Sequence, residues 1–287
     1  MAKILDGRKV REEIIKELKT ELGLLPRPLS LVIIQVGERE DSKAYIKQKK
    51  LFGEKLGIKV EHISFPAEVD EHEIVEKIKY FNQDPNVDGI IVQLPLPANL
   101  DSNKIIETID PEKDVDGLTA LNFKKLYIND ASGLMPATAK GIITLFERYH
   151  ITLTGKKVVI VGRSNVVGKP TALACLNRGA TVTICHSETK DLAKETKKAD
   201  ILIVAAGWPN LITADYVTAK QIVIDVGINL QKVEIEGVGK TLFVGDVNFN
   251  EVEPIVKAIS PVPGGVGPMT VISLFQNLLQ AYRNNLK

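Results

Sequence analysis

The fold is decided by the stretch 156–170, which reads KKVVIVGRSNVVGKP. Its run of valine and isoleucine up to Val161 predicts a strand buried on both faces of a parallel sheet. Gly162 follows at once, and we expect a helix to open at Ser164 or Asn165. A helix N-terminus behind a tight glycine turn presents main-chain N–H groups and the positive end of the helix dipole, which suit a pyrophosphate.

We interpret this turn as a dinucleotide site, with a plain strand-to-helix turn as the alternative. It departs from the usual GxGxxG pattern because Ser164 stands where the second glycine would be. The next predicted strand, 180–185, ends without a carboxylate that would bind a ribose 2′-hydroxyl. Arg163 and Ser187 suit a 2′-phosphate, so NADP is favoured over NAD, although Glu188 keeps NAD open.

The same alternation of strands and helices extends in both directions. Downstream, strand patterns at 200–205 and 221–226 complete a Rossmann-type succession. Upstream, the hydrophobic periodicity predicts helices at 7–22 and 70–81 and strands at 29–36, 58–65 and 89–94. We therefore expect an α/β protein with two parallel sheets, whose ligands bind beyond the carboxyl ends of the strands. A last helix, from Met269, is expected to pack back across a domain.

Length and composition bound the class of protein. A chain of 287 residues accommodates two domains, and 44% hydrophobic with 25% charged residues is typical of a soluble globular protein. A formal net charge of +1 gives no overall reason to bind nucleic acid or a membrane. Cys175 and Cys185 match no metal or redox motif, so no metal is expected. Without a signal peptide or a membrane-length apolar run, a cytoplasmic location is expected.

A tyrosine and a lysine share one face of the helix predicted to end at Gly57. Tyr45 and Lys49 stand at positions i and i+4. The pair is similar to the Tyr-xxx-Lys of the short-chain dehydrogenases, but there it follows the glycine-rich turn, whereas here it precedes Gly162. A solvated basic face is the alternative for such a lysine-rich helix.

Two polar residues follow the third upstream strand. Gln93, in VQLPLP (92–97), either marks a strand that stops at a site or satisfies the main chain of a loop. Asp116, in KDVDG (113–117), is either a ligand-binding carboxylate or a turn former before Gly117.

A third candidate feature is the segment 261–270, which reads PVPGGVGPMT. Stiff prolines around permissive glycines form a loop whose main chain flat rings can approach closely. A hinge between domains would explain the composition too.

Seven short motifs follow one another along the chain: Tyr45–Lys49, Val92–Pro97, Lys113–Gly117, Gly162–Pro170, Cys185–Ser187, Gly245–Val247 and Pro261–Thr270. Together they resemble the bifunctional methylenetetrahydrofolate dehydrogenase/cyclohydrolase family, and the last motif is highly specific. The resemblance implies a homodimer of two-domain subunits. Residues 1–135 with 270–287 would form a folate-binding catalytic domain that includes the C-terminal helix, and 136–269 an NADP-binding Rossmann domain.

The resemblance also implies an activity and its catalytic residues. The family oxidises 5,10-methylenetetrahydrofolate with NADP to the methenyl form and hydrolyses that product to 10-formyltetrahydrofolate, in one-carbon metabolism. Carried over to this chain, Lys49 would be the essential acid/base and Gln93 would hold and tune it. Tyr45 would stack against the folate, and Asp116 would anchor the pterin.

The remaining site residues also follow from the resemblance. Folate contacts would include Pro263, Gly264 and Gly265, and cofactor contacts would include Gly162, Arg163, Ser164, Gly168, His186, Ser187, Ala206, Gly207, Gly227, Ile228, Gly267 and Thr270. The chain departs from the family at Pro136-Ala137-Thr138-Ala139, where Pro-Cys-Thr-Pro is usual, and at 40–42, where Pro-Ala-Ser is common. A monofunctional dehydrogenase and a non-catalytic NADP-sensing protein remain the alternatives.

Overall fold

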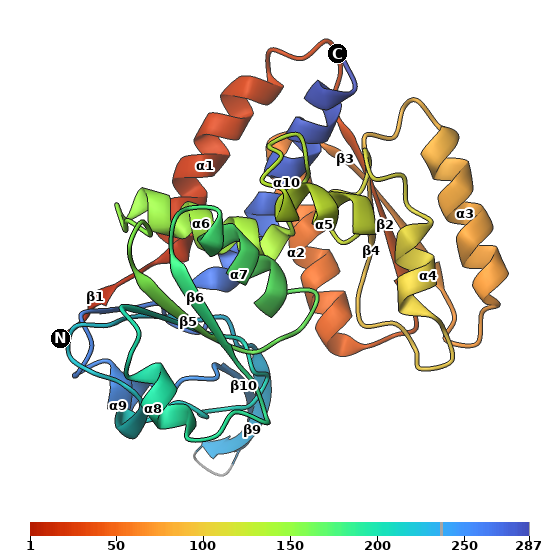
Figure 1. The fold of residues 1–287 in the computed structure, drawn as a ribbon. Helices are drawn as coiled ribbons and strands as arrows, with labels where there is room; N and C mark the ends of the chain where they lie inside the picture. Colours follow the sequence, from red (N-terminus) through yellow and green to blue (C-terminus); the bar gives the residue numbers. More distant parts are fainter. Residues whose placement is uncertain (236–237, 287) are drawn as a thin grey trace. The chain divides into compact units, whose positions relative to one another are not determined.

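In the computed structural model, which describes residues 1–235 and 238–286, the chain forms two compact units (Figure 1). The six-stranded unit comprises Met1–Glu12 and Thr138–Thr270, and the three-stranded unit comprises Glu13–Ala137 and Val271–Lys287. The first twelve residues thus pack with the Rossmann-type residues rather than with the rest of the N-terminal half. The functional limits 1–135 with 270–287 and 136–269 stay a prediction.

The three-stranded unit contains a parallel sheet in the order β3-β2-β4. Its elements are α1 (Gly7–Leu22, which begins in the other unit), β2 (Ser30–Val36), α2 (Glu40–Leu56), β3 (Lys59–Phe65), α3 (Glu71–Gln83), β4 (Gly89–Val92), α4 (Ser102–Glu107) and α5 (Ala120–Tyr127). The central strand β2 is buried from Leu31 onward, which explains why its sequence is apolar except for Ser30 and for Gln35, whose Nε2 donates to the carbonyl oxygen of Gly37 at 2.8 Å. The strands agree with those expected from the sequence.

Helices cover both faces of this sheet (Figure 1). On one face, Ile74 and Ile78 of α3 and Ile105 of α4 pack with β2 and β4 in one buried cluster. On the other lie α2 and the later part of α10 (Val266–Asn284). The amide of Asn277 donates hydrogen bonds to the carbonyl oxygens of Val115 and Met135, both at 2.8 Å. The C-terminal helix therefore returns to this unit, as expected, although it begins before Met269.

The six-stranded unit contains a parallel sheet in the order β1-β11-β8-β7-β5-β6. Its strands are β1 (Lys3–Ile4), β5 (Lys157–Val161), β6 (Thr181–Cys185), β7 (Ile201–Val204), β8 (Ile222–Asp225) and β11 (Ala258–Ile259), with an antiparallel hairpin of β9 (Asn229–Ile235) and β10 (Val238–Val244). The helices are α6 (Ala137–Arg148), α7 (Gly168–Leu176), α8 (Leu192–Thr196), the 3-10 helix η1 (Ala214–Tyr216) and α9 (Phe249–Val252). The Rossmann-type arrangement is confirmed.

The helix after Gly162 begins later than the sequence suggested. We expected it to open at Ser164 or Asn165, but α7 begins at Gly168. The hydroxyl oxygen of Ser164 accepts hydrogen bonds from the main-chain N–H groups of Val167 at 3.1 Å and Gly168 at 3.4 Å. The serine closes a turn of its own before the helix starts, which is the competing use of a short polar side chain at a helix N-terminus.

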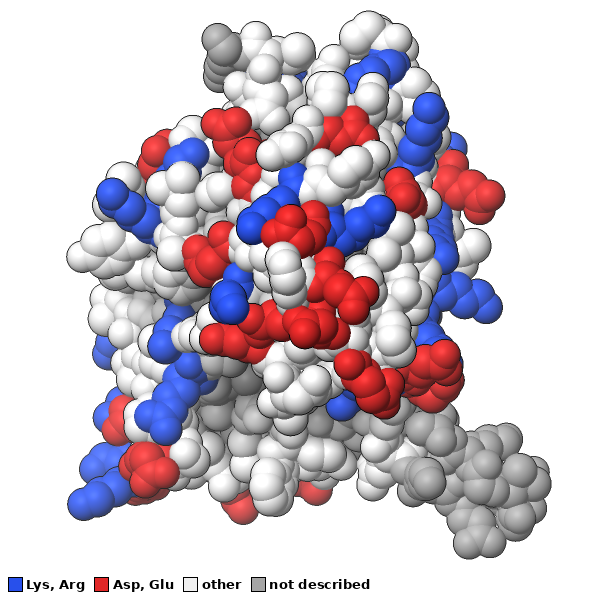
Figure 2. Space-filling view, turned by 90° about the vertical axis from the view of Figure 1, so that its right-hand side faces the viewer, with Lys and Arg blue, Asp and Glu red and all other residues white. Residues whose placement is uncertain are grey.

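The face that carries α3 and α4 mixes charges of both signs (Figure 2). Glu71 pairs with Lys104 at 2.6 Å, and Glu76 pairs with Lys79 at 2.8 Å. The part of this face that the structure describes presents no continuous basic surface of the kind that binds nucleic acid. Among the described residues, no helix is both long and apolar enough to cross a bilayer.

Candidate active site

Lys49 is a buried lysine on α2, with 6% of its surface exposed. Its Nζ donates a hydrogen bond to Oε1 of Gln93 at 2.9 Å. Gln93 follows β4 directly, and its Nε2 donates to the carbonyl oxygen of Leu94 at 2.9 Å, which orients the amide oxygen toward the lysine. Since Lys47 and Lys50 on the same helix are exposed, Lys49 does not belong to their solvated face.

Asp116 and Lys49 are both buried enough to shift their pKa values, and the charge of each affects the pKa of the other. Burial lowers the pKa of Lys49 below its ordinary value, and the negative charge of Asp116 opposes this shift. Burial likewise raises the pKa of Asp116, against the effect of Lys49 and with a smaller contribution from Asp114. A lysine with a lowered pKa exchanges its proton more readily near neutral pH, which suits it to acid–base chemistry.

Tyr45 lies one turn before Lys49 on α2 and is half-buried. Side chains at i and i+4 share one helix face, so its ring lies on the same side of α2 as the Lys49 amine. The structure therefore brings Lys49, Gln93 and Asp116 together and places Tyr45 on the adjoining helical turn.

The neighbours of Asp116 in the KDVDG motif hold the main chain rather than a ligand. Nζ of Lys113 donates to carbonyl oxygens at the end of α3, those of Phe81 at 3.0 Å, Asn82 at 2.8 Å and Asp84 at 2.7 Å. The Asp114 carboxylate accepts from the main-chain N–H groups of Gly117 at 2.9 Å and Thr119 at 2.8 Å, and from Nδ2 of Asn122 at 3.1 Å. The Asp116 carboxylate, by contrast, accepts no hydrogen bond from the described residues. It is the member of the motif that is open to a ligand.

In the six-stranded unit, the turn after β5 requires both of its glycines. Gly162 has a φ of 129°, and a Cβ there would collide with the carbonyl oxygen of Ala205 after β7. A Cβ on Gly168 would collide with the carbonyl oxygen of Gly162. Arg163 is exposed and forms no hydrogen bond or ion pair within the described part of the chain, so its guanidinium is available to an anion.

The end of β6 is a compact polar turn. The main-chain N–H of His186 donates to the hydroxyl of Thr189 at 2.8 Å, and Nδ1 of the same histidine lies 3.2 Å from the main-chain nitrogen of Glu188. The hydroxyl of Ser187 donates to the Glu188 carboxylate at 3.2 Å. A carboxylate is therefore present one residue beyond the expected serine, at the position where a ribose would be bound.

The other candidate cofactor residues also lie in the six-stranded unit. Ala206 and Gly207 follow β7, and Gly227 and Ile228 follow β8, so all four stand at the carboxyl edge of the sheet. The main-chain N–H groups of Ala206, Gly207 and Gly227 donate to two buried aspartates, Asp225 and Asp246, to which the sequence analysis assigns no role in the site. The signal was present, since each aspartate lies one or two residues from a glycine after an apolar strand.

The segment 261–270 is only partly a loop. The carbonyl oxygen of Gly264, whose φ is 121°, accepts from the main-chain N–H groups of Gly7 at 2.9 Å and Arg8 at 3.2 Å. The helix α10 already begins at Val266, so Gly267 and Thr270 are helical. The candidate folate residues Pro263, Gly264 and Gly265 thus belong to the six-stranded unit, whereas Tyr45, Lys49, Gln93 and Asp116 belong to the three-stranded unit.

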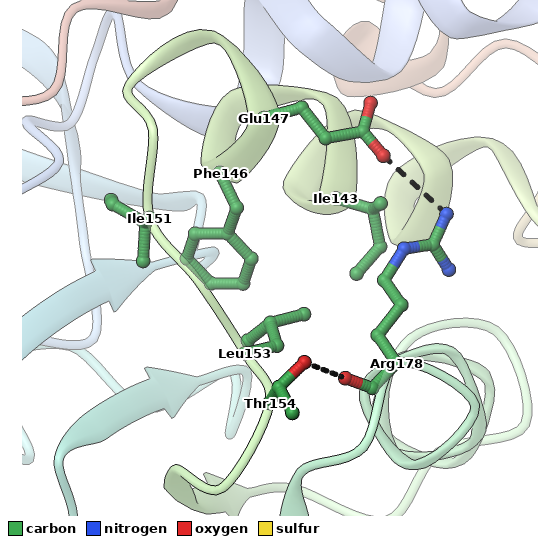
Figure 3. A pocket seen from close by; sticks show the side chains of 7 residues that line it. All are labelled: Ile143, Phe146, Glu147, Ile151, Leu153, Thr154 and Arg178. Atoms are coloured by element: carbon green, nitrogen blue, oxygen red, sulfur yellow. Dashed lines mark hydrogen bonds and ion pairs between the residues drawn. The ribbon is translucent and has the colours of Figure 1, made fainter.

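A cavity of about 260 Å³ lies elsewhere in the six-stranded unit (Figure 3). It is lined by Ile143, Phe146, Glu147, Ile151, Leu153, Thr154 and Arg178. Figure 3 shows apolar side chains around it and an ion pair between Glu147 and Arg178, 3.5 Å apart. No candidate catalytic or cofactor residue lines this cavity, so it carries no part of the site described above.

Comparison with known families gives matches over nearly the whole chain. The model for the catalytic domain of tetrahydrofolate dehydrogenase/cyclohydrolase matches residues 5–116, and the model for its NAD(P)-binding domain matches residues 136–286. The bifunctional protein FolD of Nautilia profundicola is 45% identical over 290 residues, which cover 99% of this chain and 98% of that protein.

Solved structures show the same likeness. The bifunctional FolD dehydrogenase/cyclohydrolase of Campylobacter jejuni superposes with a TM-score of 0.93 at 41% identity and covers 99% of this chain and 100% of its own. The Trypanosoma brucei enzyme, solved with NADP and an inhibitor, superposes with a TM-score of 0.94 at 33% identity and covers 100% of this chain and 99% of its own.

Proposed function

Because the chain belongs to the tetrahydrofolate dehydrogenase/cyclohydrolase family, we propose that it oxidises 5,10-methylenetetrahydrofolate with NADP and hydrolyses the methenyl product to 10-formyltetrahydrofolate. The observation that carries the proposal is the buried Lys49, hydrogen-bonded to Gln93 and facing the charge of Asp116. A non-catalytic NADP-sensing protein would have no use for this arrangement.

In the hydrolytic step, water adds to the methenyl carbon and the bond from that carbon to N5 breaks, which leaves the formyl group on N10. The neutral amine of Lys49 takes one proton from the attacking water and returns it to N5. The second water proton leaves to solvent as the formyl C=O forms, so hydrolysis of the cationic methenyl group releases one proton. Gln93 holds Nζ in place through its 2.9 Å hydrogen bond. Asp116, whose carboxylate is open, accepts paired N–H bonds from the pterin amino edge.

In the oxidative step, the bound dinucleotide would supply the acceptor for a hydride from the methylene carbon. The chain's own task is to bind and orient both molecules. The turn at Gly162 and the N-terminus of α7 suit the pyrophosphate. Arg163, which is exposed, supplies the positive charge that favours a 2′-phosphate over the bare hydroxyl. The carboxylate of Glu188 has the opposite effect, because it favours the hydroxyl of NAD.

The proposal is tested by identifying the products. Purified protein is incubated with 5,10-methylenetetrahydrofolate and either NADP or NAD, and folates are separated by mass spectrometry. We expect 10-formyltetrahydrofolate to form with NADP faster than methenyltetrahydrofolate hydrolyses in buffer alone. Accumulation of methenyltetrahydrofolate, with hydrolysis at the buffer rate, would indicate the monofunctional dehydrogenase. NADP binding without turnover would indicate the sensing protein.

We also propose that the protein is a cytoplasmic homodimer. The hairpin of β9 and β10 exposes the apolar side chains of Leu230, Leu242 and Phe243, which are 53%, 43% and 43% exposed. Exposed apolar side chains gathered on one element support contact with another chain. Both cysteines are buried free thiols, as expected in a reducing compartment. Sedimentation velocity should give a dimer, and Leu242→Lys with Phe243→Lys should give monomers.

A further inference from the structure

Two buried aspartates stand at the carboxyl edge of the six-stranded sheet. Asp225 is the last residue of β8 and is 3% exposed. Asp246 follows β10 and is 0% exposed. No cation pairs with either carboxylate among the described residues. Burial raises the pKa of Asp225 to about 7, and the main-chain N–H groups that donate to it oppose this shift. We call Asp225 and Asp246 the aspartate pair.

Asp246 holds the loop that follows β7. Its Oδ2 accepts hydrogen bonds from the main-chain N–H groups of Ala206 at 2.6 Å and Gly207 at 2.8 Å. Its Oδ1 accepts from Nδ2 of Asn229 at 2.8 Å. One buried carboxylate after β10 thus holds both the loop that follows β7 and the first residue of β9.

Asp225 completes the arrangement from the side of β8. Its Oδ1 accepts from the main-chain N–H groups of Gly227 and Asp246, and its Oδ2 accepts from that of Val247, all at 3.0 Å. A Cβ on Gly227 would collide with the Asp246 carboxylate, and one on Gly245 with the Asp225 carboxylate. The two glycines are therefore required by the aspartate pair itself.

The segments held in this way adjoin the glycine turn of β5. In the sheet, β7 lies between β5 and β8. The turn at Gly162 packs so closely on Ala205 that a Cβ would not fit between them. Ala206, the next residue, is the first one held by Asp246. A shift of the Asp246 carboxylate would therefore be transmitted to the main chain that surrounds a ligand at this edge.

We propose that the aspartate pair positions the main chain at Ala206–Gly207 and Gly227–Ile228 for the dinucleotide, and so sets its affinity without touching it. This inference rests on the proposed function, which assigns the dinucleotide to this edge. Carboxylates are suited to the role because each oxygen accepts more than one N–H group. The aspartate pair consists of positioning residues, whereas Arg163 and the glycine turn supply contacts to the ligand.

The chain contains a built-in reporter for the test. Trp208 is its single tryptophan, is 68% exposed and directly follows Gly207. NADP binding to the purified protein, without folate, can therefore be followed by tryptophan fluorescence. In Asp246→Asn, an NH₂ group replaces one of the two carboxylate oxygens that accept hydrogen bonds. We therefore expect the NADP dissociation constant and the KM for NADP to rise about tenfold or more. The folate KM should stay within about twofold, and the free protein's tryptophan emission should change.

A matched control and a rescue variant separate positioning from loss of fold. Asp200, just before β7 at the opposite edge of the sheet, accepts the main-chain N–H of Lys157 at 2.8 Å, and Asp200→Asn should leave NADP affinity unchanged. The double variant Asp246→Asn with Asn229→Asp places a carboxylate at position 229, opposite the new amide at position 246. That carboxylate accepts a hydrogen bond from the NH₂ group of the amide. The oxygen of that amide is then held toward Ala206 and Gly207, so affinity should recover at least partly.

Each outcome decides the inference. A folded Asp246→Asn that binds NADP within about twofold of wild type would overturn it, and so would an equal loss in Asp200→Asn. If Asp246→Asn does not fold, the double variant and Asn229→Ala decide, since Asn229→Ala removes only one hydrogen bond to Asp246 and should weaken NADP severalfold. A wild-type protein that does not bind NADP would instead refute the proposed function.

Discussion

Replacing Lys49 with methionine removes one ammonium group and keeps the length of the side chain. The lost hydrogen bond to Gln93, 2.9 Å long and made by a charged donor, contributes about 1.5–3 kcal/mol. Lys49 is also only 6% exposed, and desolvation of a buried charge costs several kcal/mol, which the methionine avoids. The two effects oppose each other, so we expect the free energy of unfolding to change by at most about 2 kcal/mol.

The effect on hydrolysis should be much larger. A positioned acid–base group contributes roughly 10²–10⁴ in rate, and Lys49→Met should lower cyclohydrolase turnover by that factor. Dehydrogenase turnover should fall less, because hydride transfer needs no proton transfer at Lys49. Loss of one activity without loss of the fold is the signature of a catalytic side chain.

The assay follows the decay of methenyltetrahydrofolate absorbance, with unfolding in denaturant measured on the same preparations. Lys50→Met is the matched control, since Lys50 is the next residue on α2, is exposed, and has its Nζ 2.9 Å from Nδ1 of His62. It should keep both activities. A folded Lys49→Met that hydrolyses substrate within about threefold of wild type would refute the role of Lys49.

Three further substitutions test separate parts of the account. Asp116→Asn should weaken folate binding by about 1.5–3 kcal/mol in calorimetric titration and leave NADP binding unchanged; equal losses for both ligands would make Asp116 a structural residue. Because the Asp116 charge raises the pKa of Lys49, the same variant should shift the rise of cyclohydrolase rate with pH to lower pH, and an unmoved profile would contradict the coupling. Arg163→Ala should raise the KM for NADP about tenfold or more with little effect on NAD, and an equal loss for both would assign Arg163 to the pyrophosphate. Lys113→Met, which removes hydrogen bonds to the end of α3, should lower the free energy of unfolding by about 1–3 kcal/mol but keep turnover per folded molecule; loss of turnover alone would contradict its structural role.

Long apolar strands were predictable, and short elements were not. β2 and β5 consist mostly of valine, leucine and isoleucine because both faces of a parallel strand are buried. β1 and β11 have two residues each, too few for any periodicity, and only their pairing with each other and with β8 defines them. This is why the packing of the first twelve residues with the six-stranded unit was not foreseen.

The sequence alone did not predict the role of a side chain when its partners come from distant segments of the chain. Lys113 and Lys49 are both lysines in recognised motifs, yet Lys113 caps a helix with its ammonium and Lys49 faces a glutamine and a carboxylate. Sequence spacing does not distinguish them, because the partners come from other segments of the chain. Asp246 was missed as a site residue for the same reason, since its partners at Ala206 and Gly207 are distant in sequence.

The central claim, that one chain performs both steps, is tested most directly by a single progress curve. NADPH and methenyltetrahydrofolate are recorded together after the protein is mixed with NADP and 5,10-methylenetetrahydrofolate, with methenyl hydrolysis in buffer as the baseline. We expect NADPH to exceed methenyltetrahydrofolate from the first turnovers, with the difference recovered as 10-formyltetrahydrofolate. Equal amounts of NADPH and methenyltetrahydrofolate throughout, after correction for the baseline, would contradict the claim.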